Sequence, residues 1–151
     1  MRWPGRTLVL VGLCAIALAG CRPSPRPVVE GRDACAHCKM KVTDARFAAE
    51  LITRKGKVHV FDSIECLAVH VADAVVPLED VHSAWVTDFA DAENFLRAAE
   101  AQYVRAESVR SPMGMNLAAF GTSVTPASMA ESFGGEVLNW DDVIHLVADH
   151  P

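Results

Sequence analysis

The sequence has 151 residues, with 14 lysines and arginines against 19 aspartates and glutamates, and so carries a formal net charge of −5 at pH 7. An acidic chain lacks the basic surface that neutralises phosphates, so nucleic acid and anionic membrane surfaces are poor partners for it. Cationic ligands and basic protein surfaces suit this charge better, and the length suits one ordinary domain with a core.

The first residues predict an export signal. Two arginines precede an apolar run over residues 7–20, which is shorter than the roughly 20 residues that a spanning helix needs. The letters LAGC that end at Cys21 resemble the lipobox of bacterial lipoproteins, in which the cysteine is acylated and becomes the new N-terminus. We therefore expect a signal peptide over residues 1–20 and a lipid anchor on Cys21, on the periplasmic side of a bacterial membrane. The alternative is an ordinary secreted protein with a free Cys21.

A linker and one folded domain are expected after the signal. Residues 21–32 contain the proline-rich sequence RPSPRPVVEGR, which is typical of an extended, semi-rigid spacer. The domain is then expected over residues 33–151.

The first half of this domain predicts two strands, a helix and a third strand. FAAELIT (47–53) and KVHVFDS (57–63) are typical of strands, and the turn sequence RKG between them indicates a hairpin. Apolar residues recur at helical spacing in IECLAVHVAD, so Asp62 or Ser63 is the natural N-cap of a helix. SAWVTDF (83–89) predicts the next strand.

The second half predicts the same order of elements. AQYVRAES (101–108) and NLAAFGTS (116–123) indicate strands, a helix in TPASMAESFGG is capped by Thr125, and EVLNW (136–140) is a further strand. A last amphipathic helix begins at Asp141. Its expected buried residues are Val143, Ile144 and Val147. The predicted fold class is α+β, with two β-β-α-β repeats in one compact domain plus a C-terminal helix.

The sulfur atoms of the domain indicate a site for a soft metal. Cys35, Cys38 and Cys66 form an odd set, which does not suit purely structural disulfides in an oxidising compartment. Met113 and Met115 lie in the polar turn VRSPMGMNL, where the hydrophobic effect gives little reason for thioethers. Thiolates and thioethers together select copper(I) over zinc, calcium or magnesium. Cys66 itself is expected in the core, on the buried side of its helix.

The cysteine pair in CAHC also permits other interpretations. Attachment of c-type haem needs a histidine directly after Cys38, where Lys39 stands, and a zinc ribbon needs a second cysteine or histidine pair. A thioredoxin-like redox pair should follow a strand and open a helix, which this pair does not, although redox use stays open. The histidines that can complete a site are His37, His59 and His70.

Five blocks of the sequence resemble one known family. In order, they are CAHCKMKV, KVHVFDSIECLAVHV, AWVTDF with AAEAQYV, SPMGMNLAAFG and GGEVLNWDDV. They resemble the NosL family, copper-binding lipoproteins of nitrous oxide reductase assembly, over residues 33–147. The resemblance implies two β-β-α-β halves related to the organomercurial lyase architecture. It also implies carriage of copper(I) to apo nitrous oxide reductase, by way of an ABC-type assembly complex.

The resemblance carries over residue by residue to the sulfur donors. It implies Cys38 as the principal thiolate, with Met40 beside it and Met113 from the PMG block. Cys35 matches a family cysteine and can be a second thiolate or a disulfide partner. Lys39 stands where family members often have glycine, which reduces the backbone freedom expected between Cys38 and Met40.

We therefore expect a lipid-anchored copper(I) metallochaperone and not an enzyme, with Met115 as a spare donor at most. A low coordination number would suit delivery, because an open site permits ligand exchange with an acceptor. Two alternatives stay open. One is a thiol-dependent redox or lyase-type enzyme that uses Cys35 and Cys38, and the other is a metal-free scaffold lipoprotein of the assembly complex.

Overall fold

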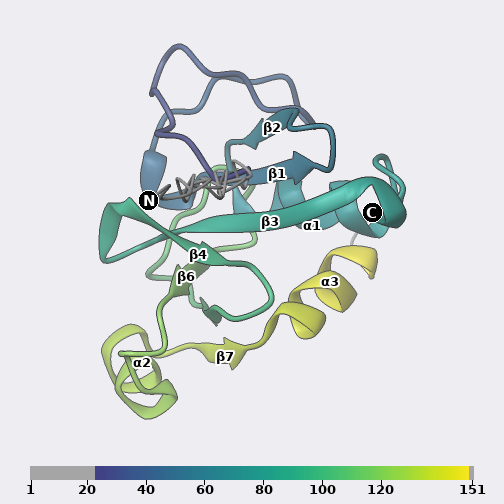
Figure 1. The fold of residues 1–151 in the computed structure, drawn as a ribbon. Helices are drawn as coiled ribbons and strands as arrows, with labels where there is room; N and C mark the ends of the chain where they lie inside the picture. Colours follow the sequence, from purple (N-terminus) through teal and green to yellow (C-terminus); the bar gives the residue numbers. More distant parts are fainter. Residues whose placement is uncertain (1–22, 150–151) are drawn as a thin grey trace, which may run out of the picture.

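Two antiparallel sheets and three α-helices make up residues 23–149, the part of the chain that this computed structural model describes (Figure 1). One sheet has the strand order β2-β1-β3-β4 and the other β6-β5-β7. The elements are η1 (Ala45–Phe47), β1 (Ala49–Thr53), β2 (Val58–Phe61), α1 (Ile64–Ala72), η2 (Leu78–Asp80), β3 (Val81–Asp88), β4 (Asp91–Arg97), β5 (Gln102–Arg105), β6 (Leu117–Phe120), α2 (Pro126–Phe133), β7 (Glu136–Leu138) and α3 (Trp140–Ala148). The α+β class is confirmed, and the two predicted repeats are β1-β2-α1-β3 and β5-β6-α2-β7.

The membrane predictions fall largely outside this part of the chain. The signal peptide and the lipid anchor on Cys21 lie outside the described residues. Among residues 23–149, no helix combines the length and the apolar character needed to cross a membrane.

The β1–β2 hairpin leads directly into α1, and the cap of this helix fixes its first turn. β1 and β2 pair from Ala49 opposite Phe61 onward. Ser63 is the N-cap, because its side chain accepts a hydrogen bond from the backbone N–H of Cys66 at 3.2 Å. One of the two predicted caps is thereby confirmed, and Cys66 is held at the start of the helix.

The strand β4 has no counterpart among the predicted elements. It pairs with β3 at the edge of the first sheet, and most of its residues are exposed. Its sequence DAENFLR therefore lacks the apolar alternation that indicates a half-buried strand. The guanidinium of Arg97 stacks 4.3 Å from the ring centroid of Trp85 on the neighbouring strand.

The C-terminal helix α3 begins one residue before the predicted position. Asn139 and Asp142 form a capping box at its start, so the first helical residue is Trp140. Val143 and Val147 are buried as expected, whereas Ile144 is only partly buried. The helix packs against α1, and α1 also contacts strands of both sheets. The helix α1 therefore lies at the junction of the two halves.

The segment before Asp33 packs against the first sheet from Arg26 onward. The backbone N–H of Arg26 donates to Oε2 of Glu50 at 3.1 Å, and its guanidinium forms an ion pair with Asp33 at 2.7 Å. Gly31 donates its backbone N–H to the carbonyl of Val42 at 2.8 Å. Part of the predicted spacer over residues 21–32 is thus part of the folded unit.

Candidate metal centre

Cys35 and Cys38 lie on a tight loop that an isolated β-bridge closes at its base. Cys35 donates its backbone N–H to the carbonyl of Met40 at 2.8 Å, and Lys39 donates to the carbonyl of Cys35 at 3.1 Å. Lys39 has a φ of 68°, in the left-handed region that favours glycine. The backbone of the cysteine loop therefore turns sharply at Lys39, the residue between Cys38 and Met40.

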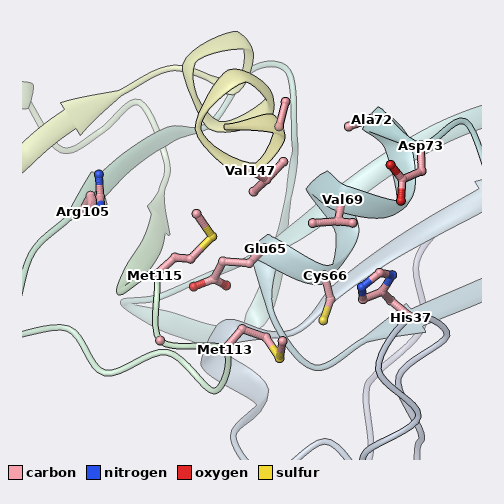
Figure 2. A pocket seen from close by; sticks show the side chains of 12 residues that line it. His37, Glu65, Cys66, Val69, Ala72, Asp73, Arg105, Met113, Met115 and Val147 are labelled. Carbon is pink, nitrogen blue, oxygen red and sulfur yellow. The ribbon is translucent and has the colours of Figure 1, made fainter. Parts of the chain in front are cut away.

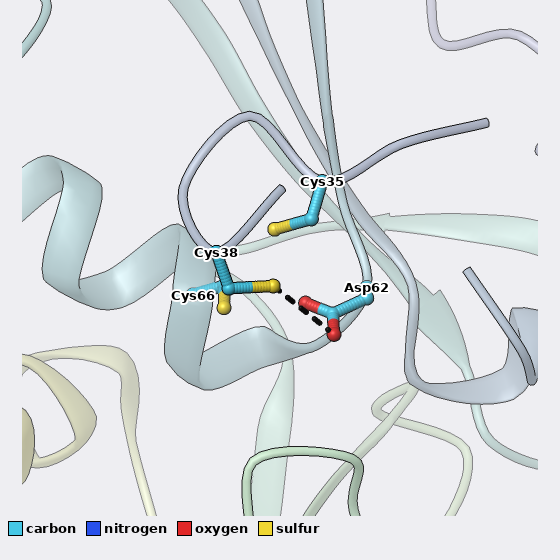
Figure 3. Close-up of side chains that lie close together, drawn as sticks. All are labelled: Cys35, Cys38, Asp62 and Cys66. Atoms are coloured by element: carbon cyan, nitrogen blue, oxygen red, sulfur yellow. Dashed lines mark hydrogen bonds between the residues drawn. The ribbon is translucent and has the colours of Figure 1, made fainter. Parts of the chain in front are cut away.

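The two loop cysteines meet a third cysteine and a carboxylate. The ligand atoms of Cys35, Cys38, Asp62 and Cys66 all lie within 4.8 Å of one another, and we call these four residues the thiol cluster (Figure 3). Asp62 follows β2, and Cys66 lies in the first turn of α1. Cys35, Asp62 and Cys66 are each 1% exposed, whereas Cys38 is partly exposed. All three cysteines are free.

The charges of the thiol cluster favour a cation. The thiol of Cys38 donates to Oδ2 of Asp62 at 3.5 Å, and the buried Oδ1 of Asp62 has no hydrogen-bond partner. A hydrogen bond from Cys66 lowers the pKa of Cys35 to about 6. The same contact raises the pKa of Cys66, and burial raises that of Cys38. The cluster therefore places one thiol of lowered pKa and two thiols of raised pKa beside Asp62, and a metal ion that binds the sulfurs would displace their protons.

A cavity of about 780 Å³ lies beside the thiol cluster (Figure 2). It is lined by side chains of α1, α3 and the PMG loop, including Glu65, Cys66, Met113, Met115 and Val147, together with His37. Cys66 is the member of the thiol cluster that also lines this cavity. Figure 2 shows the sulfur atoms of Cys66 and Met113 on the same side of the cavity. The loop methionine and the thiol cluster therefore meet at Cys66.

A buried carboxylate joins the PMG loop to α1. Glu65 is 2% exposed, and its Oε1 accepts a hydrogen bond from the hydroxyl of Ser111. The same hydroxyl oxygen accepts from the backbone N–H of Asn116 at 2.8 Å. Burial raises the pKa of Glu65, and its Oε2 has no hydrogen-bond partner. This contact ties the loop that carries Met113 to the first turn of α1.

The structure brings some of the predicted donors together and leaves one apart. Cys35 and Cys38 lie in the thiol cluster, and Met113, 41% exposed, lies in the cavity wall. Met115 also lines the cavity. Met40 is 50% exposed and is not among the residues that line the cavity; its backbone carbonyl closes the cysteine loop instead.

The predicted histidines divide between two places. His37 lines the cavity beside Met113. His59 and His70 lie with their ring centroids 5.6 Å apart and line a second cavity, away from Met113. His70 also packs its ring edge against Phe61, at 5.0 Å between centroids. Of the three histidines, His37 is the one placed to approach the methionine loop.

Two residues of the thiol cluster were not predicted as site residues. Cys66 was expected only in the core, and it is indeed buried there, but its sulfur also faces the other thiols. Asp62 was considered only as a helix cap, a role that Ser63 takes. A signal was present in the sequence, because Asp62 and Cys66 stand on either side of the predicted cap at Ser63.

Comparisons with known proteins agree with this architecture. The sequence profile of the NosL family matches residues 27–147. A solved structure, described as the crystal structure of the copper chaperone NosL from Shewanella denitrificans, is 23% identical, with a TM-score of 0.66, and the match covers 80% of this chain and 95% of that one. At this identity the likeness shows a shared fold. No curated protein matches the chain. Because the family profile spans most of the sequence, the chain belongs to the NosL family.

Proposed function

We propose that this protein is a metallochaperone that binds and carries copper(I). The observation that carries the proposal is the convergence of three thiols beside a cavity whose wall presents Met113. Sulfur donors of both kinds favour a soft monovalent ion over zinc or hard divalent cations. The solved relative described as a copper chaperone supports the same function.

The exposure of the donors suits an ion that is passed on. Cys38 is partly exposed and Met113 is 41% exposed, so an acceptor can reach both, and we assign them as principal donors. Cys35 and Cys66 are almost fully buried. Buried sulfur atoms would shield the ion from water on the side of the core, and the accessible sulfur atoms would permit ligand exchange on the side of the solvent.

We further propose where the copper goes. The lipobox at Cys21 supports attachment to a bacterial membrane, on the periplasmic side. The family resemblance supports delivery to apo nitrous oxide reductase, through an ABC-type assembly complex. The acidic net charge is consistent with protein partners that present basic surfaces.

The test is the copper content of the reductase in cells that lack their own copy of this protein. Wild-type protein should restore copper to the reductase, whereas Cys38→Ser and Met113→Ala should leave it copper-poor. Ser128→Ala, an exposed change on α2, is the control and should restore copper fully. Full restoration by Cys38→Ser and Met113→Ala would contradict the proposal and favour the metal-free scaffold.

A thiol-dependent enzyme is the second candidate, and the thiol cluster itself favours it. The lowered pKa of Cys35 beside the buried carboxylate of Asp62 is an arrangement that nucleophilic catalysis can use. Turnover of a thiol-reactive substrate by the copper-free protein, lost in Cys35→Ser, would support this candidate. Absence of turnover with intact copper binding would leave the carrier function.

A further inference from the structure

Cys66 connects two parts of the molecule that each contain a principal copper donor. The thiol cluster contains Cys38, and the cavity wall contains Met113. Cys66 belongs to both. An ion that touches the sulfur of Met113 and the thiolate of Cys38 must therefore lie on the side of the cluster that Cys66 faces.

We propose that Cys66 is the third copper(I) ligand, so that Cys38, Cys66 and Met113 together form a site of two thiolates and one thioether. The proposal deepens the function proposed above and rests on it. It gives Cys35 a different role: its sulfur lies against those of the other two cysteines, within 4.8 Å, and does not bind the ion. Copper(I) displaces the protons of the Cys38 and Cys66 thiols; the adjacent sulfur of Cys35 can accept the proton of Cys66, the other proton passes to water, and the oxidation state of copper does not change.

The distances within the cluster permit this coordination. Two sulfur donors on one metal ion are at most about 4.6 Å apart, twice the roughly 2.3 Å metal–sulfur bond of protein thiolate sites. The ligand atoms of the cluster lie within 4.8 Å of one another, so a small inward movement brings the sulfurs of Cys38 and Cys66 onto a common ion. Cys38 lies on a loop, which can make this movement more easily than the helix that carries Cys66.

Cys35 is less well placed as the second thiolate. It is 1% exposed and is not among the residues that line the cavity beside Met113. A Cys38–Cys35 site would therefore leave the thioether of Met113 without a role. Cys66 is equally buried but lines the cavity. It would therefore exclude water from the side of the ion that faces the core, while the side that faces the cavity stays open to an acceptor.

The buried carboxylate of Asp62 is a second, independent indication of a cation. Its Oδ1 is buried without a hydrogen-bond partner, and such oxygens are rare in folded proteins unless an ion or water occupies the space. The carboxylate shares the space within 4.8 Å of the three thiols. A positive ion at the sulfurs of Cys38 and Cys66 would offset the negative charge of Asp62 and so lower the cost of its burial.

The experiment compares Cys66→Ala with Cys35→Ala, two buried cysteines from the same cluster. Each variant, labelled with selenomethionine and loaded anaerobically with one copper(I), is examined by X-ray absorption, which separates Cu–S from Cu–Se scattering. Wild type should show two Cu–S contacts and one Cu–Se contact. Cys66→Ala should lose one Cu–S contact and bind copper(I) at least roughly 10- to 100-fold more weakly. Loss of a residue that only supports a metal ligand typically lowers metal affinity by this factor, and loss of the ligand itself should lower it at least as much. Cys35→Ala should keep both Cu–S contacts.

The outcomes separate this inference from the proposed function. If wild type binds no copper(I), the proposed function fails. If Cys66→Ala keeps the Cu–S number and affinity of wild type, or if Cys35→Ala is the variant that loses a Cu–S contact, copper carriage stands and the assignment of Cys66 is wrong. Thermal unfolding of the metal-free variants checks that each one folds. If Cys66→Ala does not fold, the Cys35→Ala spectrum decides: two Cu–S contacts support Cys66 as the second thiolate, and one contact assigns that role to Cys35.

Discussion

The buried carboxylate of Glu65 accepts a hydrogen bond from Ser111, 46 residues further along the chain, and so joins the helix of Cys66 to the loop of Met113. The loop turns at Gly114 and Asn116, both with positive φ. The contact between Glu65 and Ser111 therefore ties the loop that carries Met113 to α1 at a buried point.

Ser111→Ala should destabilise the fold and weaken copper binding together. The change leaves the carboxylate of Glu65 and the backbone N–H of Asn116 without this partner, which should cost about 1–3 kcal/mol of unfolding free energy. Denaturant unfolding and copper(I) titration measure the two effects. Ser108→Ala is the control, since its exposed hydroxyl bonds only the carbonyl of Phe133, at 3.0 Å. Equal effects from the two variants would refute the role of Ser111.

Met113 and Met40 should differ in their contribution to copper binding, although both were predicted as donors. Met113 lines the cavity beside Cys66, whereas Met40 is half exposed and does not line it. We expect Met113→Ala to weaken copper(I) affinity by at least roughly 10-fold and Met40→Ala to change it far less. A competition titration measures both constants. A larger loss in Met40→Ala would show that the copper lies on the outer side of the cysteine loop.

Replacing Lys39 by glycine should stabilise the cysteine loop modestly. A left-handed backbone costs a residue with a side chain about 1–2 kcal/mol, and glycine at position 39 would remove this cost. The stabilisation is partly offset, because glycine gives the unfolded chain more conformational freedom. The net increase in unfolding free energy should be below about 1 kcal/mol. Lys41→Gly, at a neighbouring position without a positive φ, should instead lower stability. Thermal unfolding compares the two, and destabilisation by both would contradict the backbone account.

Stability should fall as pH rises through the range in which Glu50 ionises. Burial raises the pKa of Glu50 to about 7 in the folded state, above the ordinary glutamate value of 4.5. The folded state therefore binds the proton of Glu50 more tightly than the unfolded chain does. The resulting contribution to the free energy of unfolding is fully present below about pH 4.5 and is lost as pH rises through about 7. Glu50→Gln should flatten this part of the profile of unfolding free energy against pH. Glu93→Gln, on the exposed strand β4, serves as the charge control, and an identical flattening there would overturn the assignment.

Local patterns predicted most of the fold because the helices carry caps and turn sequences separate the strands. Ser63 and Thr125 both cap helices as expected, and the predicted hairpin forms as β1 and β2. β4 was missed because an exposed edge strand has no apolar face to reveal it. The packing of Arg26 against Glu50 was missed because it depends on a backbone hydrogen bond to a residue 24 positions away.

The candidate site was only partly visible in the sequence for a similar reason. The cysteine pair and the PMG turn stand out because thiols and thioethers lie in polar loops. Cys66 lies in a helix whose other buried residues are largely apolar, so its pattern matches a core position equally well. Its second role follows from the approach of the cysteine loop to α1, a tertiary contact that spacing along the chain does not encode.

The most direct test of the central claim is a titration of reduced residues 23–151 with copper(I) against a competing chelator, repeated with zinc and with Cys38→Ser. We expect one tightly bound copper(I) per chain, weaker binding of zinc, and severe loss of copper affinity in Cys38→Ser. Tighter binding of zinc, or copper affinity that is unchanged in Cys38→Ser, would contradict it.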